Sequence, residues 1–176
     1  IQNEQFGTGH ALLQTRESIK TETFMVMYGD DLYHHDDIKK TLKKDLCVTA
    51  KEVNDTSRFG IFTVKNGFLK ELVEKPKDSE SNLANTGLYI LNKDIFDFVE
   101  KTRKSSRNEF ELTDSIFQMS KECSIKCEVT NNWLPIGYPW DLLTANEIKL
   151  KELNASIDNT SNLDRNVTID GDVKIG

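Results

Sequence analysis

The sequence lacks the features that would place it in a membrane or on a nucleic acid. It has no signal-peptide pattern and no apolar stretch of the roughly 18 residues that a membrane-spanning helix needs. It has no long run of like charge, and 29 acidic residues against 23 basic ones give a net charge of -6. Nucleic acids and anionic lipids attract cationic surfaces, so neither is expected as the main partner. We expect a cytoplasmic protein.

Cysteine is also scarce. The sequence has three cysteines, Cys47, Cys123 and Cys127, and only the last two have a spacing that could suggest a metal pair. No second Cys/His pair with zinc spacing follows them, so a zinc site is not indicated. We expect all three to be reduced structural cysteines.

What is present is a globular composition, with 37% hydrophobic and 30% charged residues in 176. This length favours one domain, or one domain with an appendage. Short apolar runs typical of strands alternate along the chain with segments whose apolar residues have helical spacing. This order favours an α/β layered domain with a mixed sheet. The expected strands are 24–28, 46–50, 60–64, 68–73, 88–91 and 124–129, and the expected helices are 8–20, 38–44, 94–101, 112–121 and 141–153. The strand at 24–28 is expected to be buried and central, and Asn66-Gly67 predicts a two-residue hairpin turn.

The composition changes after the last predicted helix. Residues 154–165 are rich in Asn, Ser, Thr and Asp, as linkers are. In 166–176, Val167 and Val173 are six residues apart, as are Ile169 and Ile175. A six-residue period is typical of a parallel β-helix, although an ordinary edge strand broken by Asp-Gly fits equally well. We therefore divide the chain into a domain at 1–153, a linker at 154–165 and a hexapeptide segment at 166–176.

Two segments place polar groups where ligands commonly bind. Gln2 to Ala11 is glycine-containing and leads into a helix start, but it lacks the Gly-Lys-Ser/Thr ending of a Walker loop and the third glycine of the dinucleotide fingerprint. From the residues alone, a simple turn and helix cap explains it better than a ligand site does. Tyr28-Gly29-Asp30-Asp31 puts carboxylates just beyond a strand, where they could hold Mg²⁺, or where they could simply form a turn.

A third segment, Glu74-Lys75-Pro76, follows the second strand of the predicted hairpin. A glutamate can accept hydrogen bonds from sugar hydroxyls, and a lysine can neutralise a phosphate. Charged residues at strand ends are also often simply solvated.

Five motifs occur in one order along the chain: Tyr28-Gly-Asp30, Val73-Glu-Lys-Pro76, Asn85-Thr-Gly-Leu-Tyr89, Glu111-Leu-Thr-Asp114 and Ile136-Gly-Tyr-Pro-Trp-Asp-Leu-Leu143. Together they resemble the sugar-1-phosphate nucleotidyltransferase family, which includes the glucose-1-phosphate uridylyl- and thymidylyltransferases. The segment from Glu4 to Ala11 and the six-residue repeats near the C-terminus are most similar to the bifunctional N-acetylglucosamine-1-phosphate uridyltransferases. The resemblance implies a Rossmann-like nucleotidyltransferase domain whose N-terminal part is absent, followed by the start of a left-handed parallel β-helix.

The resemblance also implies a reaction and a set of partners. A nucleoside triphosphate, UTP or dTTP, would react with a sugar-1-phosphate in a Mg²⁺-dependent step to give a nucleotide sugar and pyrophosphate. A homo-oligomer is expected. Catalytic roles are implied for Asp30, as the metal ligand, and for Lys75, near the sugar phosphate. The remaining positions are implied to bind the nucleotide (Gln2, Gly7, Thr8, Tyr28 and Gly29) or the sugar (Gly60, Glu74, Asn85 and Glu111).

The sequence departs from the family pattern in two places. The glycine-rich loop that holds the triphosphate, with its arginine and the following lysine, precedes anything in this chain, so we expect these 176 residues alone to be inactive. Where relatives have Trp-x-Asp-Ile-Gly, with the second metal-binding aspartate, this chain has Trp133-Leu-Pro135-Ile-Gly. Asp141 or a water would then have to take the place of that ligand.

Two other classes of function compete with the enzyme. Pro135 would suit a non-catalytic relative that binds a nucleotide sugar and regulates or scaffolds an active partner. The hexapeptides would suit an ancillary domain of a β-helix acetyltransferase. His34 and His35 also invite a metal site, but adjacent side chains diverge, and we expect surface residues before a helix.

Overall fold

The computed structural model of the chain describes residues 1–76, 78–152 and 156–176. The chain divides into two compact units, one formed by 1–29 with 33–133 and the other by 30–32 with 134–176. The two units are described separately here. No helix among the described residues has both the length and the apolarity to cross a membrane.

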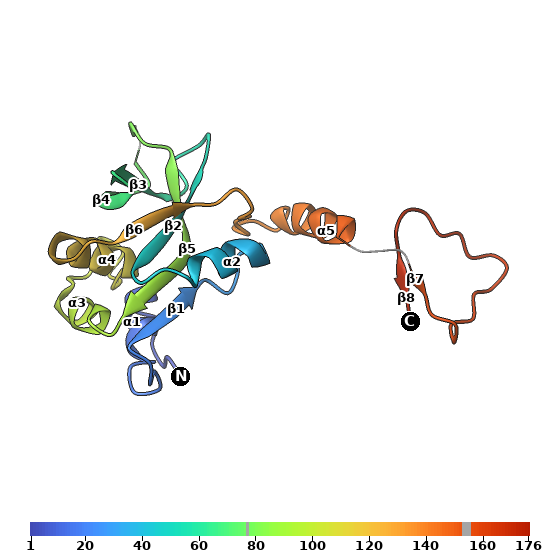
Figure 1. The fold of residues 1–176 in the computed structure, drawn as a ribbon, viewed down its shortest axis with the longest axis horizontal. Coiled ribbons are helices and arrows are strands. Elements are labelled where there is room, and N and C mark those ends of the chain that lie inside the picture. Colours follow the sequence, from blue (N-terminus) through green and yellow to red (C-terminus); the bar gives the residue numbers. More distant parts are fainter. Residues whose placement is uncertain (77, 153–155) are drawn as a thin grey trace. The chain divides into compact units, whose positions relative to one another are not determined.

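A six-stranded mixed sheet forms the framework of the first unit (Figure 1). Its strand order is β1-β5-β2-β6-β4-β3, and β5 also pairs with β3. Only β2 and β6 run parallel, and the other neighbours are antiparallel. The strands are β1 Thr23–Met27, β2 Cys47–Glu52, β3 Gly60–Lys65, β4 Phe68–Glu74, β5 Leu83–Asn92 and β6 Lys126–Val129. The expected mixed sheet is confirmed.

Five helices accompany the strands: α1 Thr8–Leu13, α2 His35–Thr41, α3 Ile95–Lys101, α4 Leu112–Glu122 and, in the second unit, α5 Asp141–Lys151. All five lie where the sequence predicts a helix, although α1 ends earlier than expected. In the first unit α1, α3 and α4 pack on one another, and α4 also contacts β4. In α4 the apolar residues recur at helical spacing, so Leu112, Ile116 and Met119 are all buried on one face.

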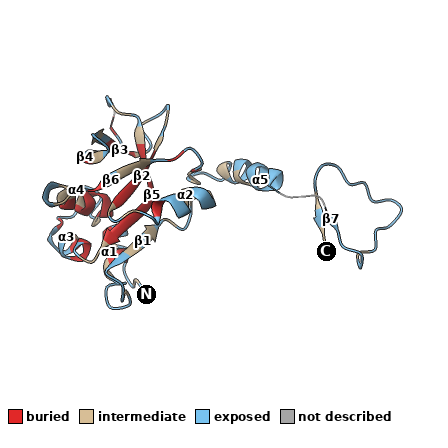
Figure 2. Ribbon diagram, viewed as in Figure 1, coloured by how far each residue is buried: buried red, intermediate tan, exposed pale blue. Residues whose placement is uncertain are grey.

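The hydrophobic core lies between this helical layer and the central strands (Figure 2). Tyr89, Phe96 and Ile116 are among its largest fully buried side chains. The strand β1 departs from expectation, because it lies at the sheet edge and its burial alternates between exposed and intermediate. The prediction of a buried central strand there is wrong in the part of the chain that the structure describes, since β1 pairs on one side only, with β5.

The predicted hairpin is confirmed. Asn66 and Gly67 join β3 to β4, with φ of 54° and 79°. Two consecutive left-handed residues form the turn whose twist matches that of the flanking strands. The hairpin brings the end of β4 back beside the start of β3, so that Gly60 pairs with Glu74.

Gly87 is the sharpest backbone constraint in the sheet. It has φ of 74° inside β5, and a Cβ placed on it would lie 2.3 Å from the Cδ2 atom of Tyr28. The backbone N–H of Tyr28 also donates to the carbonyl of Gly87, at 3.2 Å. The ring of Tyr28 therefore lies directly on the backbone of β5, which only glycine permits.

The second unit joins segments that lie far apart in the sequence. Leu32 and Leu134 exchange two backbone hydrogen bonds, at 3.0 and 2.9 Å, and Asp31 accepts one from the N–H of Ile136, at 3.0 Å. The helix α5 has no buried residue. Beyond it, β7 Ser156–Ile157 and β8 Lys174–Ile175 pair in parallel. Residues 156–176 show no β-helix stack beyond this pair, and the boundary expected at residue 153 lies outside the described residues.

Replacing Gly87 by alanine should destabilise the protein by more than about 3 kcal/mol, because the substitution adds a clash with Tyr28 to the cost of a left-handed alanine. Gly67→Ala is the matched control, since Gly67 has φ of 79° but no atom within 4 Å of the added Cβ. Gly67→Ala should lower the free energy of unfolding by only about 1 kcal/mol, the cost of a left-handed backbone at alanine. Urea unfolding followed by circular dichroism measures both, and equal losses would contradict the steric argument.

Candidate functional site

Three of the four residues expected to bind a sugar meet at one place in the first unit. A Cβ placed on Gly60 would lie 3.0 Å from Oε2 of Glu74 and 3.8 Å from Cβ of Asn85. Each comes from a different strand, β3, β4 and β5 respectively. Gly60 has no side chain beside the carboxylate, and a larger residue there would press against Glu74.

Asn85 is held in place by the tyrosines beside it. Its Nδ2 donates to the hydroxyl of Tyr89 at 2.7 Å, and its Oδ1 accepts from the N–H of Gly87 at 3.0 Å. The hydroxyl of Tyr89 lies 3.4 Å from that of Tyr28. Burial raises the pKa of both phenols, and Tyr89 is raised well above its ordinary value. Both tyrosines are therefore neutral hydrogen-bonding groups that fix the amide.

Arg107 lies among three carboxylates and is the functional candidate that the sequence analysis missed. Its guanidinium is 2.9 Å from Glu111, 3.9 Å from Glu109 and 4.0 Å from Glu74. Ser105 also donates to Glu111, at 2.8 Å. Arg107 precedes Glu111 by four residues, but the two are joined by a turn and not by a helix, so no periodicity signals the pair. The fourth residue expected to bind the sugar, Glu111, is thus linked to Glu74 by the guanidinium of Arg107, which lies close to both carboxylates.

Opposing effects act on the pKa of the Glu74 carboxyl, which is raised above its ordinary value. Partial burial raises its pKa, and the positive charges of Arg107 and Lys75 lower it. Glu111 and Asp114 act in the same direction as burial, because nearby negative charge disfavours ionisation. Glu74 can accept hydrogen bonds when ionised, and its charge depends on Arg107.

The N-terminal segment lies against the turn that carries this arginine. Gly7 has φ of 94°, and a Cβ on it would lie 2.8 Å from Cβ of Glu109. Thr8 accepts the backbone N–H of Leu112 at 3.1 Å and also hydrogen-bonds Tyr28. Gly7 is therefore explained by close backbone packing, while Thr8 links this segment to the tyrosine network.

Gln2 lies beside the same segment. Its Nε2 is 3.3 Å from the carbonyl of Gly7 and 2.9 Å from Nδ1 of His10. Of the predicted nucleotide residues, the structure thus brings together Thr8 and Tyr28, and separately Gln2 and Gly7. Gly29 is exposed, and an added Cβ would meet no atom within 4 Å.

Lys75 has a strained backbone at the end of β4. Its φ is 46°, although it precedes Pro76 and is not glycine. Its N–H donates to the carbonyl of Phe59 at 3.0 Å, which holds this conformation. Strain of this kind costs about 1–3 kcal/mol and is concentrated at functional positions. The side chain of Lys75 is exposed and has no ion-pair partner among the described residues.

The two aspartates predicted at the metal position belong to the second unit and differ in their environment. Asp30 is exposed and has no hydrogen-bond or ion-pair partner among the described residues. Asp141 accepts the N–H groups of Gly137 and Tyr138 on its Oδ2, at 3.0 and 2.9 Å. Asp30 therefore offers a free carboxylate, whereas one oxygen of Asp141 organises the turn before α5.

His34 and His35 form the one cluster of three metal-capable groups found among the described residues, together with Asp36. Their ligand atoms lie within 4.8 Å of one another. Nδ1 of His34, however, accepts the N–H of Asp36 at 3.3 Å, so that His34 caps the start of α2. His34 thus precedes the helix as expected, whereas the exposed His35 is the first residue of α2.

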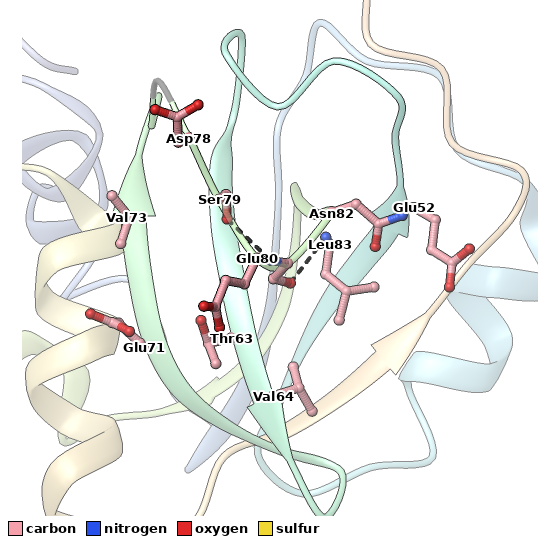
Figure 3. A pocket seen from close by; sticks show the side chains of 11 residues that line it. Glu52, Thr63, Val64, Glu71, Val73, Asp78, Ser79, Glu80, Asn82 and Leu83 are labelled. Carbon is pink, nitrogen blue, oxygen red and sulfur yellow. Dashed lines mark hydrogen bonds between the residues drawn. The ribbon is translucent and has the colours of Figure 1, made fainter.

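A pocket of about 610 Å³ lies beside the β3–β4 hairpin and the segment before β5 (Figure 3). Glu52, Glu71, Asp78 and Glu80 line it, and its described lining includes no basic residue. Since phosphorylated substrates need positive charge, this pocket does not suit them.

The three cysteines are free, as expected. Burial raises the pKa of Cys47 to about 11 and that of Cys127 to about 12. Such thiols stay protonated near neutral pH and are poor nucleophiles. They belong to the structure and not to the chemistry.

The comparisons with known proteins agree with this geometry. A family model described as nucleotidyl transferase matches residues 1–152. The bifunctional protein GlmU of Methanocaldococcus jannaschii is 38% identical over 177 residues, covering 99% of this chain and 42% of the relative. A bifunctional sugar-1-phosphate nucleotidylyltransferase/acetyltransferase of Sulfurisphaera tokodaii is 35% identical, with coverage of 96% and 42%. The chain thus spans less than half the length of these relatives.

Solved structures show the same likeness. The crystal structure of an apo UDP-glucose pyrophosphorylase superposes with a TM-score of 0.75 at 29% identity, covering 86% of this chain and 62% of that one. A UDP-glucose pyrophosphorylase complexed with UDP-glucose gives a TM-score of 0.73 at 27% identity, with coverage of 85% and 64%.

Replacing Arg107 by glutamine should lower the free energy of unfolding at pH 7 by about 1–2 kcal/mol, because the nearly buried carboxylate of Glu111 loses its charged partner. The pKa of Glu74 should rise further, since Arg107 holds it down. A carboxyl with a raised pKa destabilises the folded state as pH rises through its titration, so the loss should be smaller at pH 4 than at pH 7. Urea unfolding at both pH values and ¹³C NMR titration measure these effects.

Arg16→Gln is the matched control, because Arg16 pairs with Asp97 and Glu100 at an exposed position. Exposed pairs contribute about 0–1 kcal/mol. A loss for Arg107→Gln that equals the control and does not change with pH would contradict the proposed role of Arg107.

Proposed function

We propose, on the premise that this chain belongs to the nucleotidyl transferase family, that it contributes the sugar-binding part of a sugar-1-phosphate nucleotidyltransferase. The reaction joins a nucleoside triphosphate to a sugar-1-phosphate and releases pyrophosphate. The observation that carries the proposal is the convergence of Gly60, Glu74 and Asn85 from three strands. A carboxylate and an amide that lie close together are groups that bind adjacent sugar hydroxyls.

The sugar would be oriented by the groups that converge there. Glu74 would accept hydrogen bonds from hydroxyls, and Asn85 would offer its amide beside them. The contacts of Asn85 with Tyr89 and Gly87 support this role, because they fix the amide before a ligand arrives. Preorganised groups lose less entropy on binding and hold the reacting phosphate in position.

The cation beside Glu74 that would neutralise the sugar phosphate is Lys75. It follows Glu74 directly and is unpaired among the described residues, so its ammonium is available. Arg107, 4.0 Å from Glu74, is bonded to Glu111 and would hold the carboxylates in place. In the reaction, an oxygen of the sugar phosphate forms a bond to the α-phosphorus, the bond from that phosphorus to the bridging oxygen breaks, and pyrophosphate leaves. The protein's part is positioning and charge neutralisation.

The residues also fit a magnesium ion, which the family reaction uses. Mg²⁺ prefers hard oxygen ligands and commonly takes one or two carboxylates together with phosphate oxygens and waters. Asp30 offers an exposed and unpartnered carboxylate of this kind among the described residues. Asp141 carries the second carboxylate proposed for the ion, and its Oδ2 accepts two N–H groups. When bound, the ion would neutralise phosphate charge.

Nucleotide recognition is proposed for the N-terminal segment. Gln2 carries an amide that could bond the edge of uracil or thymine, and Thr8 connects to Tyr28. Gly29 would let the nucleotide approach the backbone, and Gly7 would position the segment by its packing against Glu109. UTP and dTTP would both be accepted, because one methyl group supplies little discrimination.

We also propose that residues 156–176 form a coil of a left-handed parallel β-helix. The register of β7 and β8 supports it, because Ile157 pairs in parallel with Ile175, and 175 minus 157 is 18. Eighteen residues are three six-residue faces, as expected for one coil of such a helix. Relatives named as bifunctional acetyltransferases suit a β-helix at this place. A homo-oligomer in the cytoplasm remains our prediction.

In the intact protein, Asp30→Asn and, separately, Glu74→Gln should each lower kcat/KM for a sugar-1-phosphate by about a hundredfold or more, because the first removes a carboxylate proposed to hold the metal ion and the second an acceptor proposed to orient the sugar. Pyrophosphate release is measured with UTP or dTTP and with glucose-1-phosphate or N-acetylglucosamine-1-phosphate. Glu71→Gln is the control for Glu74, as it is exposed on the same strand. Full activity in both variants would refute the assignment. Nucleotide-sugar binding without turnover would instead favour the regulatory alternative.

A further inference from the structure

A second surface pocket, of about 460 Å³, lies beside the C-terminal end of α3 and one face of α4. Four of its eight lining residues are basic and one is acidic, Asp114. The basic residues are Lys101, Arg103, Lys104 and Lys121. In a chain with a net charge of -6, this is a local concentration of positive charge.

None of these four cations forms an ion pair within residues 1–76, 78–152 and 156–176. Elsewhere in the first unit, cations such as Arg16, Lys44 and Arg107 are bound to carboxylates. Unpaired like charges gathered at one pocket repel one another, and an anion placed among them relieves the repulsion.

Three of the four cations contact aromatic rings, and one of these rings, Phe117, lines the pocket itself. The ammonium of Lys104 lies 4.3 Å from the ring centre of Phe6, and that of Lys121 lies 4.5 Å from the ring centre of Phe117. Lys101 lies over Phe98 at 5.9 Å. A cation over an aromatic face keeps its charge and its outward N–H donors, and it loses some freedom before any ligand binds.

Two further residues of the pocket bear on anion binding. Gln118 lines the pocket, and its side-chain amide has no hydrogen-bond partner among the described residues, so its N–H groups remain available. Partial burial and the negative charge of Glu111 raise the pKa of Asp114. The positive charge of Arg107 acts in the opposite direction on the same pKa.

We propose that the pocket between α3 and α4 binds a small molecule with two or more phosphoryl groups. Lys101, Arg103, Lys104 and Lys121 neutralise its charge, and Gln118 donates to its oxygens. A diphosphate offers two charged groups to these cations, so we expect it to bind more tightly than a single phosphate. The ligand is either a free diphosphate or the diphosphate portion of a nucleotide. This inference does not rest on the proposed function, because the pocket shares no residue with the sugar site.

The test is an NMR titration of the ¹⁵N-labelled chain with pyrophosphate, with UDP and with inorganic phosphate, all without divalent metal. Pyrophosphate should shift the amide resonances of residues 101–104 and 114–121, with binding at least about tenfold tighter than that of phosphate. Similar shifts with UDP indicate a nucleotide ligand, and their absence with UDP indicates a free diphosphate. Raising the salt concentration should weaken binding, because the charges are exposed.

The double variant Arg103→Gln/Lys121→Gln should raise the dissociation constant for pyrophosphate at these amides by about tenfold. Lys65→Gln/Lys70→Gln removes the same charge from exposed positions on the β3–β4 hairpin and should leave it unchanged. The proposal is overturned if wild-type shifts are absent from 101–104 and 114–121, or if both double variants weaken binding equally. Shifts confined to the sugar site would overturn it while leaving the proposed function standing.

Discussion

The contact between the ring of Tyr28 and the backbone of Gly87 is the constraint on which the candidate site depends. The left-handed φ of Gly87 and its missing Cβ let Tyr28 lie on β5. From there Tyr28 reaches Tyr89, and Tyr89 fixes Asn85. The strand itself pairs with β1, β2 and β3, so Asn85 is anchored to most of the sheet. An amide held this way presents one fixed arrangement to a ligand.

Electrostatics complements this rigidity. Arg107 carries one positive charge among Glu74, Glu109 and Glu111, so the cluster stays net negative. Such a cluster is stable only while the arginine is present, because a nearly buried carboxylate without a partner is costly. An approaching phosphate would compete with these carboxylates for the same guanidinium. The four cations beside α3 and α4 face no such competition, and the two regions therefore differ in how readily they accept an anion.

The elements that could be predicted are those with a strong local cause. The turn at Asn66-Gly67 requires two left-handed residues, and Asn and Gly adopt that conformation readily, so the hairpin was predictable to within one residue. The strand β5 was predicted at 88–91 but begins at Leu83, because Asn85 and Gly87 break the apolar run that marks a strand. Its early part is specified by tertiary contacts with β2 and β3, which no local pattern reveals. The same limit explains why Arg107 was missed, since only folding brings it to Glu74.

The two cations next to the sugar candidates differ in a way that separates their roles. Arg107 is bonded to Glu111, and its planar guanidinium is already oriented before a substrate arrives. The ammonium of Lys75 has no partner among the described residues, but its backbone is held in a left-handed conformation by Phe59. A flexible side chain on a constrained backbone can follow a phosphate as its geometry changes, whereas a bonded guanidinium cannot. The side chain of Lys75 is thus suited to neutralise the phosphate as its charge changes during the reaction. Arg107 is suited to hold the carboxylates around Glu74 in place.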